Sequence, residues 1–564
     1  MKLNFKNSTP SGPGRRPEGF VFALVGTLLF FSLSSWAQEG NDSQVTQIPS
    51  GPYRIAGTVV NAKTGSPLAR ARVTIENARQ RQSVQFVITG DDGHFEFHVP
   101  SGKYSLGGAK RGFITSSYNQ HEQFSTAIVT AADLDTETLV LRLQPNAVLN
   151  GQVFDEFQEP VRNAEVMLYR ESNAQGFKRI DRSRAATTND EGRYEITPLE
   201  PGTYFVGVKA MPWYAVHPES AADGSKSPSH VDPALDVAYP TTYYGDTTET
   251  DSAIPIPVRG GDHLEADIHL APVPALHFIV HVPESKAPGE YSLPRLEKKM
   301  LDGEEQAENA SIRQVADGVF ELSGIAAGRY TVKMNETNGP ARESSDVDLT
   351  SGGELDVSSG TVASAVKVTV QIAGATAAPP QTQIGLRSGK GRVNFMPVDD
   401  KGEAAFSEVT PGKYDLVAVS RQQAYSVTRI TSEAGTINGH TLSVPAGASL
   451  NLTVTLVGGS ATIEGFAKRD GKAVAGAMIV LAPKEAGADR TRFRRDQSDL
   501  DGSFTLPNVI PGAYTIVAID DGWDLNWSEP GALTTYLSHG QTVEVADHER
   551  SPISLPDAVQ VQAR

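Results

Sequence analysis

Hydrophobic and polar positions alternate along most of this chain in short runs. Phe95 and Phe97 flank Glu96, and the stretch from Tyr414 to Val419 alternates in the same way. Alternation with a period of two places one face of a β-strand in a core and the other face in solvent. Helical periodicity is nearly absent, and its best example, residues 297–308, is interpreted as an insertion. The pattern therefore predicts an all-β fold made of short strands.

A pair of turn signals recurs five times along the chain. Each copy has a first glycine followed shortly by an aromatic residue, then a second glycine nine or ten residues later and a tyrosine two residues beyond it. In chain order these turn residues are Gly93, Gly102 and Tyr104; Gly192, Gly202 and Tyr204; Gly318, Gly328 and Tyr330; Gly402, Gly412 and Tyr414; and Gly502, Gly512 and Tyr514. Such a recurrence indicates tandem repeats of one structural unit.

Each part of the repeated pattern has a physical reason. The first glycine provides the positive φ angle of a tight turn between antiparallel strands. In most copies the second glycine follows a proline, and we expect it to take the left-handed conformation of a second turn. The tyrosine after it is expected to bury its ring while its hydroxyl reaches the backbone of the turn.

The repeat divides the chain into five predicted domains. Three copies open with a similar strand, namely residues 55–59, 149–153 and 463–467, whereas the third and fourth open with plainer strands around 278–282 and 366–372. Short polar linkers are expected, for example at 353–361. The predicted ranges are 1–37 for a signal peptide, 38–52 for a linker, 53–145, 146–272 (with a long tail), 273–352, 362–447 and 459–558 for the domains.

These residues resemble the carboxypeptidase regulatory-like family, which is close to the collagen-adhesin B-type domains. The resemblance is carried by the opening Ile-x-Gly-x-Val at Ile55, the Pro-x-x-x-Ala-x-Val entry at Pro67 and the two turns of the repeat. It is strong in copies one, two and five, and weak in copies three and four. It implies seven-stranded prealbumin-like β-sandwiches, which are Ig-like and often grouped with carbohydrate-binding-like folds. It also implies export and an accessory role, but no particular ligand.

The N-terminal segment has the layout of a secretory signal peptide. Basic residues precede an apolar run over 20–33, and Ser35-Trp36-Ala37 places small residues at a cleavage site. Export to the periplasm, the cell surface or the exterior is expected, with no membrane span after cleavage. An uncleaved membrane anchor is the alternative.

Net charge and cysteine content limit the classes of binding partner and of chemistry that we expect. The chain of 564 residues has a formal net charge of −17 and no cysteine. A predominantly acidic surface disfavours nucleic acid and anionic lipid. Without cysteine, the domains depend on packing for their stability, and thiol chemistry is excluded.

No catalytic or metal-binding motif stands out, so we expect neither enzymatic activity nor a cofactor or metal. His277 and His281 alternate on one strand and are interpreted as an exposed strand face, and His94, His98 and His121 form only a loose cluster. The acidic stretch 499–501 places carboxylates on a tight turn, as calcium-binding loops do. It lacks the bidentate acid that such a loop needs several residues later, so we interpret it as a hairpin turn.

Carbohydrate binding is the most specific function that the sequence suggests. Sugar sites use exposed aromatic rings with polar groups beside them. Two aromatic sets lie outside the expected strands: Trp213 and Tyr214 with Tyr239, Tyr243 and Tyr244, and Trp523 with Trp527. The alternative is that these rings fix long loops to their own domain or to a neighbour. Exposure of the rings would favour sugar binding, and burial would favour a scaffold.

The sequence thus predicts a non-catalytic, exported string of β-sandwich domains. Its surfaces would be presented to a protein or a polysaccharide of the cell envelope or the exterior. A dedicated carbohydrate-binding protein is the alternative function.

Overall fold

The computed structural model describes residues 47–78, 83–130, 134–218, 232–281, 293–308, 310–334, 342–356, 360–373, 381–389, 393–420, 423–432, 435–485, 490–547, 549 and 552–564. The predicted signal peptide and most of the linker after it lie outside these residues. Within the described part of the chain, no helix combines the length and the apolar character needed to cross a membrane.

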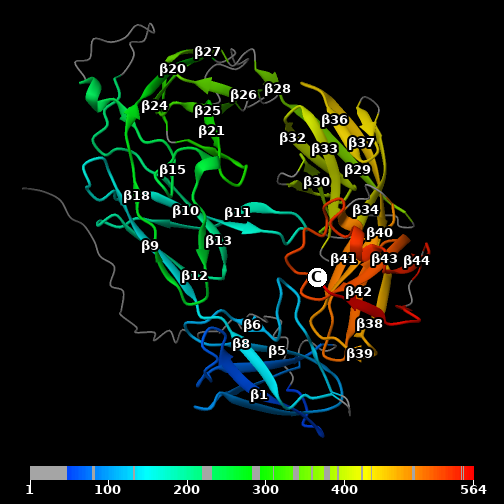
Figure 1. The fold of residues 1–564 in the computed structure, drawn as a ribbon. Helices are drawn as coiled ribbons and strands as arrows, with labels where there is room; N and C mark the ends of the chain where they lie inside the picture. Colours follow the sequence, from blue (N-terminus) through cyan, green and yellow to red (C-terminus); the bar gives the residue numbers. More distant parts are fainter. Residues whose placement is uncertain are drawn as a thin grey trace, which may run out of the picture. The chain divides into compact units, whose positions relative to one another are not determined.

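The described residues form five successive β-sandwich modules, which Figure 1 colours from blue to red. Module 1 contains β1 (Tyr53–Asn61), β2 (Arg72–Asn77), β3 (Val84–Ile88), β4 (His94–Val99), β5 (Lys103–Ala109), β6 (Ser116–Ser117), β7 (Ile128–Val129) and β8 (Leu139–Leu143). Module 2 contains β9 (Ala147–Phe154), β10 (Glu165–Ser172), β11 (Arg179–Thr187), β12 (Arg193–Leu199), β13 (Gly202–Lys209), η1 (Pro233–Leu235), β14 (Val237–Ala238), β15 (Thr242–Tyr243), η2 (Thr250–Ser252), β16 (Ile256–Val258), β17 (His263–Glu265) and β18 (Ile268–His269).

The remaining strands build three further modules. After β19 (Val273–Pro274), module 3 contains β20 (Leu276–His281), β21 (Arg295–Lys299), β22 (Glu305–Ala307), β23 (Ser311–Ala316), β24 (Val319–Ile325), β25 (Gly328–Met334), β26 (Arg342–Leu349), β27 (Gly353–Asp356) and β28 (Thr361–Val362). Module 4 contains β29 (Ser364–Ile372), β30 (Gln383–Arg387), β31 (Val393–Pro397), β32 (Glu403–Val409), β33 (Gly412–Val419), β34 (Tyr425–Ser432), β35 (Thr436–Asn438), β36 (Thr441–Val444) and β37 (Ser449–Gly458). Module 5 contains β38 (Ala461–Arg469), β39 (Lys472–Ala473), β40 (Met478–Pro483), η4 (Arg490–Arg492), β41 (Arg494–Gln497), β42 (Ser503–Val509), β43 (Gly512–Ile519), α1 (Thr534–Leu537), β44 (Gln541–Val545), β45 (Pro552–Ser554) and β46 (Val559–Gln562).

All five modules share one strand wiring. The opening strand pairs antiparallel with the strand that follows the first glycine turn and parallel with a strand near the end of its module, as β1 does with β4 and β8. The same pairs are β9 with β12 and β17, β20 with β24 and β27, β29 with β32 and β37, and β38 with β42 and β46. Modules 3 and 4, whose sequence pattern is weak, therefore have the same fold as the others.

A separate hydrophobic core lies between the sheets of each module. In module 1 the core includes Phe95 and Phe97, which are each 1% exposed, and equivalent aromatic residues are buried in the others. Alternation along each strand produces this one-sided burial, as in β5, whose positions alternate between buried and half-buried. The predicted all-β sandwich fold is confirmed.

The first glycine of every repeat takes the left-handed conformation. The φ angles are 70° at Gly93, 69° at Gly192, 67° at Gly318, and 79° at both Gly402 and Gly502. A side chain at such a φ is strained, and only glycine adopts it freely. These residues turn the chain into the strand that pairs with the opening strand.

The second glycine does not behave as the sequence suggested. The φ angles of Gly202 and Gly512 are 157° and 148°, far from the left-handed helical region but still in a range that residues with a side chain rarely adopt, and the second glycine of the other copies has no positive φ. At Gly102, which has no positive φ, close packing favours glycine, because a Cβ there would lie 3.3 Å from the Tyr104 ring. The expectation of a left-handed second turn is therefore wrong.

Two other local predictions are corrected. The helix-like stretch 297–308 contains β21 and β22, which pair with each other, and β21 also pairs with β25. Burial of Leu296 and Met300 overrides the local helix propensity. The expected linker 353–361 includes β27, whose parallel pairing with β20 completes the module 3 sheet.

Candidate functional site

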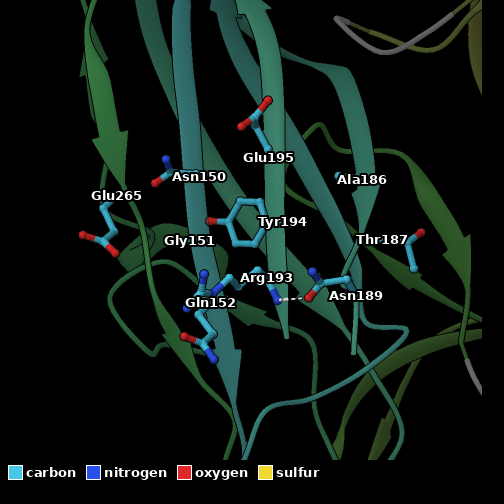
Figure 2. Close-up of a pocket in the computed structure, with 10 residues that line it drawn as sticks. All are labelled: Asn150, Gly151, Gln152, Ala186, Thr187, Asn189, Arg193, Tyr194, Glu195 and Glu265. Carbon is cyan, nitrogen blue, oxygen red and sulfur yellow. Dashed lines mark hydrogen bonds between the residues drawn. The ribbon is translucent and has the colours of Figure 1, made fainter. Parts of the chain in front are cut away.

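A wide hollow of about 620 Å³ lies on module 2 (Figure 2). Its lining comes from β9, β11, β12 and β17 and from the turn before β12. Ten residues line it: Asn150, Gly151, Gln152, Ala186, Thr187, Asn189, Arg193, Tyr194, Glu195 and Glu265. The side chains are mostly polar and exposed, as expected for the outer face of a sheet.

The hollow offers hydrogen-bonding groups but no activated one. Tyr194 donates its hydroxyl to the backbone oxygen of Ala266 at 2.5 Å, and burial raises the pKa of its phenol. The backbone N–H of Arg193 donates to Asn189 Oδ1 at 2.9 Å, which closes the turn before β12. These bonds hold the module together, and among the ten described lining residues none is a nucleophile paired with a base.

Trp523 lies at a junction where modules 1, 2 and 5 meet. The side chain is 6% exposed, and its ring stacks on His121 with centroids 4.9 Å apart and an interplanar angle of 3°. Its backbone oxygen accepts a hydrogen bond from Asn173 at 3.2 Å. Of the aromatic rings proposed for sugar binding, this one is covered by other modules.

Ion pairs and backbone bonds accompany the Trp523 contact. Arg495, whose side chain is 5% exposed, forms an ion pair with Glu122 at 2.6 Å, and its guanidinium lies 4.5 Å from the centre of the Trp527 ring. Asp499 accepts the backbone N–H of Ala127 at 2.8 Å and pairs with Lys103.

The stretch 499–501 is therefore a turn, as the sequence suggested, but Asp499 also binds module 1. The contact between Asp499 and Ala127 could not be predicted from the sequence, because the two residues are more than 370 positions apart in the chain.

A neighbouring carboxyl group is electrostatically unusual. Burial raises the pKa of Asp496 to about 6, and the charge of Asp499 adds to the effect. Backbone N–H groups of Thr505 and Gln497 and the charge of Lys103 oppose it. Thr505 donates to the Asp496 carboxyl at 2.7 Å. The group is thus a structural acceptor in the module 5 sheet.

Trp527 lines a second hollow, of about 350 Å³, beside the same junction. Its other lining residues include Phe124, Phe177, Arg490 and Arg495. Arg490 lies over the Phe177 ring at 4.4 Å, and Trp527 packs on Phe493 with centroids 5.7 Å apart. Trp527 is half-buried, so part of this ring remains accessible from the hollow.

The aromatic set of module 2 is divided between surface and core. Trp213 is 84% exposed and meets Tyr214 edge-to-face at 6.0 Å. Tyr214 and Tyr239 both donate their hydroxyls to Glu156, Tyr239 at 2.8 Å. Burial opposes the charge of Glu156, but the bonds from Tyr214, its own backbone and Tyr239 outweigh it and lower the pKa of the carboxyl.

The last two rings of that set are structural. Tyr243 is 1% exposed, and Tyr244 packs against the core of module 2. The sequence grouped five aromatic residues, whereas the structure leaves Trp213 alone on the open surface.

Histidines predicted to be exposed are placed differently from one another. The side chain of His281 is 46% exposed, as expected for an open strand face, and His94 and His98 are exposed as well. His277 is only 25% exposed and contacts Asp236 at 2.8 Å, so its assignment to an exposed face is wrong. The carboxylate that covers it belongs to the tail of module 2, which strand alternation in the sequence cannot reveal.

Comparisons with known proteins agree with the fold. A model of the carboxypeptidase regulatory-like domain matches residues 54–144, within module 1, and 148–227, which include strands β9 to β13 of module 2. A comparison with curated proteins found no match.

Among solved structures, the Bacillus anthracis TIE protein is 14% identical with 74% of each chain covered and a TM-score of 0.16. The minor pilin GBS52 of Streptococcus agalactiae is 14% identical over 42% of this chain and 100% of its own, with a TM-score of 0.21. Two B repeat units of the collagen binding protein of Staphylococcus aureus are 11% identical over 72% of this chain and 99% of their own, with a TM-score of 0.12. Similarity at this level carries no functional inference.

The family match falls on two of the three modules in which the sequence resemblance is strong, and all five modules share one strand wiring. Residues 54–144 and 148–227 therefore match the carboxypeptidase regulatory-like domain, within a chain of tandem β-sandwich modules.

Proposed function

We propose that this chain is a non-catalytic scaffold or binding protein, exported to the cell envelope or beyond, whose modules fix one another through side-chain contacts. The observation that carries the proposal is the burial of Trp523 against His121. A ring suited to ligand binding is used instead to hold module 5 against module 1. The partner would be a protein or a polysaccharide that contacts the exposed sheet faces.

The pKa values and bonding partners of the buried tyrosines and carboxyl groups support a role without catalysis. Among the described residues, burial inside the modules is the main cause of the raised pKa values of tyrosines such as Tyr194 and Tyr330. Perturbed carboxyl groups such as Asp499 and Glu156 are occupied by ion pairs or hydrogen bonds that stabilise the fold. Catalytic sites use such groups differently, with a nucleophile, a base and an open position converging on one point.

Limited proteolysis of the mature chain tests the scaffold role. Trp523→Ala should expose the junction and speed cleavage near residues 119–127, because a fully buried tryptophan typically contributes about 3–5 kcal/mol. Trp213→Ala is the matched control, since that ring is 84% exposed and should change the cleavage rate little. Equal cleavage of the two variants, with both folded, would contradict the scaffold role. Release of products from envelope polysaccharide or peptides by the purified chain would contradict the absence of catalysis.

Polysaccharide binding is the second candidate function, and the exposure of Trp213 favours it. An open indole face can stack on a sugar ring, and Glu156 and Tyr214 place polar groups nearby. The accessible part of Trp527 and the adjacent arginines make the hollow beside it a further candidate, suited to acidic sugars.

A glycan array with purified wild-type chain, Trp213→Ala and Trp527→Ala tests this second function. Loss of binding in one variant alone would support the function and locate its site. Binding that neither substitution weakens would place the sugar elsewhere. Absence of binding to any glycan would leave the scaffold with a protein partner.

A further inference from the structure

We propose that His217, Asp236 and His277 bind a single divalent transition-metal ion, for which Zn²⁺ is the best match, between the tail of module 2 and the opening strand of module 3. Each residue offers one ligand atom, and the three atoms all lie within 4.8 Å of one another. Two imidazole nitrogens and a carboxylate oxygen form a donor set that Zn²⁺ favours in proteins.

The three ligands come from separate segments that backbone contacts hold together. The N–H of Val216, next to His217, donates to the oxygen of Leu235 at 2.8 Å. The oxygen of Asp236 accepts the N–H of Ala275 at 2.9 Å, and β14 pairs antiparallel with β19 just before His277. The ligand positions are thus fixed by the main chain, as metal sites require.

The spacing of the ligand atoms suits a small metal ion. His217 Nδ1 lies 2.9 Å from Asp236 Oδ1, and His277 Nε2 lies 2.8 Å from Asp236 Oδ2. In a tetrahedral site with bonds of about 2.0–2.1 Å, neighbouring ligand atoms are about 3.3 Å apart. Small side-chain rotations that move the ligand atoms apart by a few tenths of an ångström would open the space for the ion. The two imidazoles are already nearly perpendicular, at 72° with centroids 6.1 Å apart.

Space and charge beside the ligands also fit a cation. A small cavity of about 10 Å³, room for about one water molecule, is lined by His217, Glu308 and Gly324. The Glu308 side chain is 8% exposed, and its Oε2 is buried without a hydrogen bond and lies 3.6 Å from Lys209 Nζ. Water in the cavity would complete the coordination, with Glu308 oriented towards it as an acceptor. A Cβ on Gly324 would lie 2.6 Å from His217 Nε2, so glycine leaves room for the imidazole.

The other histidine–carboxylate contacts of the described chain do not bring three ligand atoms within 4.8 Å of one another. His269 lies 3.2 Å from Asp246, and both side chains are more than 40% exposed. His98 lies 2.9 Å from Glu96 and is 56% exposed. The side chains of His217, Asp236 and His277 are only 16%, 19% and 25% exposed. They are already largely shielded from water, so the desolvation cost of binding an ion is smaller for them. A metal here would cross-link modules 2 and 3 without any cysteine.

Titration of the metal-free mature chain with Zn²⁺, followed by calorimetry, tests the proposal. We expect one ion per chain, and an affinity at least about 10-fold weaker in His277→Gln and in Asp236→Asn, because each removes one of three ligands. His269→Gln is the matched control and should bind as the wild type does. Zinc should also raise the unfolding temperature of the wild type and of the control, but not of the two ligand variants.

Cobalt provides a second readout that does not depend on one variant folding. The visible absorption of Co²⁺ bound to the wild type should change in His217→Gln, which alters a ligand outside β20. If wild type and all three ligand variants bind zinc equally, the site is elsewhere and the proposal is overturned. It is also overturned if the wild type binds no zinc, because the three residues then form only a hydrogen-bonded clasp.

Discussion

At the scale of single residues, a tyrosine hydroxyl closes the same turn in every module. Tyr104 donates to Pro100 O at 3.0 Å, and the tyrosine of each other repeat donates to the backbone oxygen four residues before it. The ring lies in or against the core, and its hydroxyl satisfies a carbonyl at the end of the sheet. One side chain thus joins packing and turn geometry, which explains why tyrosine rather than phenylalanine recurs.

Removal of this hydroxyl should destabilise one module. In Tyr514→Phe the oxygen of Ile510, now 2.7 Å from the hydroxyl, loses its buried donor. We expect the free energy of unfolding of module 5 to fall by about 1–3 kcal/mol. Denaturation followed by tryptophan fluorescence checks this, since Trp523 and Trp527 report on that module. Tyr53→Phe, a half-buried tyrosine outside the motif, should change stability by less, and an equal loss in both variants would contradict the explanation.

The buried carboxyl of Asp496 should make stability depend on pH. Its pKa is raised from 3.8 to about 6 in the folded chain, so between pH 4 and 6 the unfolded chain ionises first. The contribution of this group is therefore fully present below pH 4 and is lost as the pH rises through 6, by about 3 kcal/mol.

Asp496→Asn isolates this effect, because the amide oxygen can still accept from Thr505 and cannot ionise. The difference in unfolding free energy between variant and wild type, measured at several pH values, should shift in favour of the variant from pH 4 to 7. A difference that stays constant over this range would show that Asp496 does not titrate abnormally.

At the scale of elements, close contact between strands explains the glycine of the opening strand. A Cβ on Gly151 would lie 2.2 Å from the oxygen of Ala266, and one on Gly57 would lie 2.0 Å from the oxygen of Leu139. Neither glycine has a positive φ, so the reason is the neighbouring backbone and not the turn geometry. The glycine of the opening strand thus allows close packing against the parallel segment at the end of the module.

Gly151→Ala should therefore be costly. The backbone after β17 must move to admit the methyl group, and such overpacking typically costs about 1–3 kcal/mol. Gly353→Ala is the matched control, because its Cβ would meet nothing within 4 Å and its φ is not positive. Thermal unfolding should show a lower midpoint for the first variant only. Equal midpoints would mean that the β9 pairing adjusts without cost.

The sequence predicted the elements where local signals agreed with the fold. Turn glycines and alternating aromatic residues located the strands of modules 1, 2 and 5, and the opening strands of modules 3 and 4 as well. The interpretation of residues 297–308 as a helix-like insertion was wrong, because β21 at the start of this stretch pairs with β25 in the module 3 sheet. The prediction of a linker at residues 353–361 was also wrong, because this segment includes β27, a short polar strand that forms by pairing with β20.

At the scale of the whole molecule, contacts between modules use residues that look ordinary in the sequence. Glu122 and Arg495 are 373 positions apart, and neither belongs to a motif. The three residues of the proposed metal site are also scattered, and they meet only because β14 pairs with β19. These contacts depend on how the modules are joined. The local pattern of hydrophobic and polar residues does not contain that information. The division of aromatic rings between surface and junction has the same cause.

The ion pair between Arg495 and Glu122 should carry measurable coupling between modules. Both side chains are largely buried, at 5% and 17% exposure, so removal of one charge leaves the other without its partner. Arg495→Met and Glu122→Gln should each destabilise module 5 by on the order of 3 kcal/mol. The double variant should lose less than the sum, with a coupling energy above about 1 kcal/mol.

A Trp213→Phe background makes this double-mutant cycle specific, because fluorescence of the mature chain then comes from Trp523 and Trp527 alone. The exposed pair Arg162–Asp190, with side chains 65% and 79% exposed, is the control and should give a coupling near zero. Coupling at the buried pair would establish that module 1 stabilises module 5 in solution. If both cycles gave zero, the two modules would fold independently, and the scaffold would have to be a flexible chain of modules.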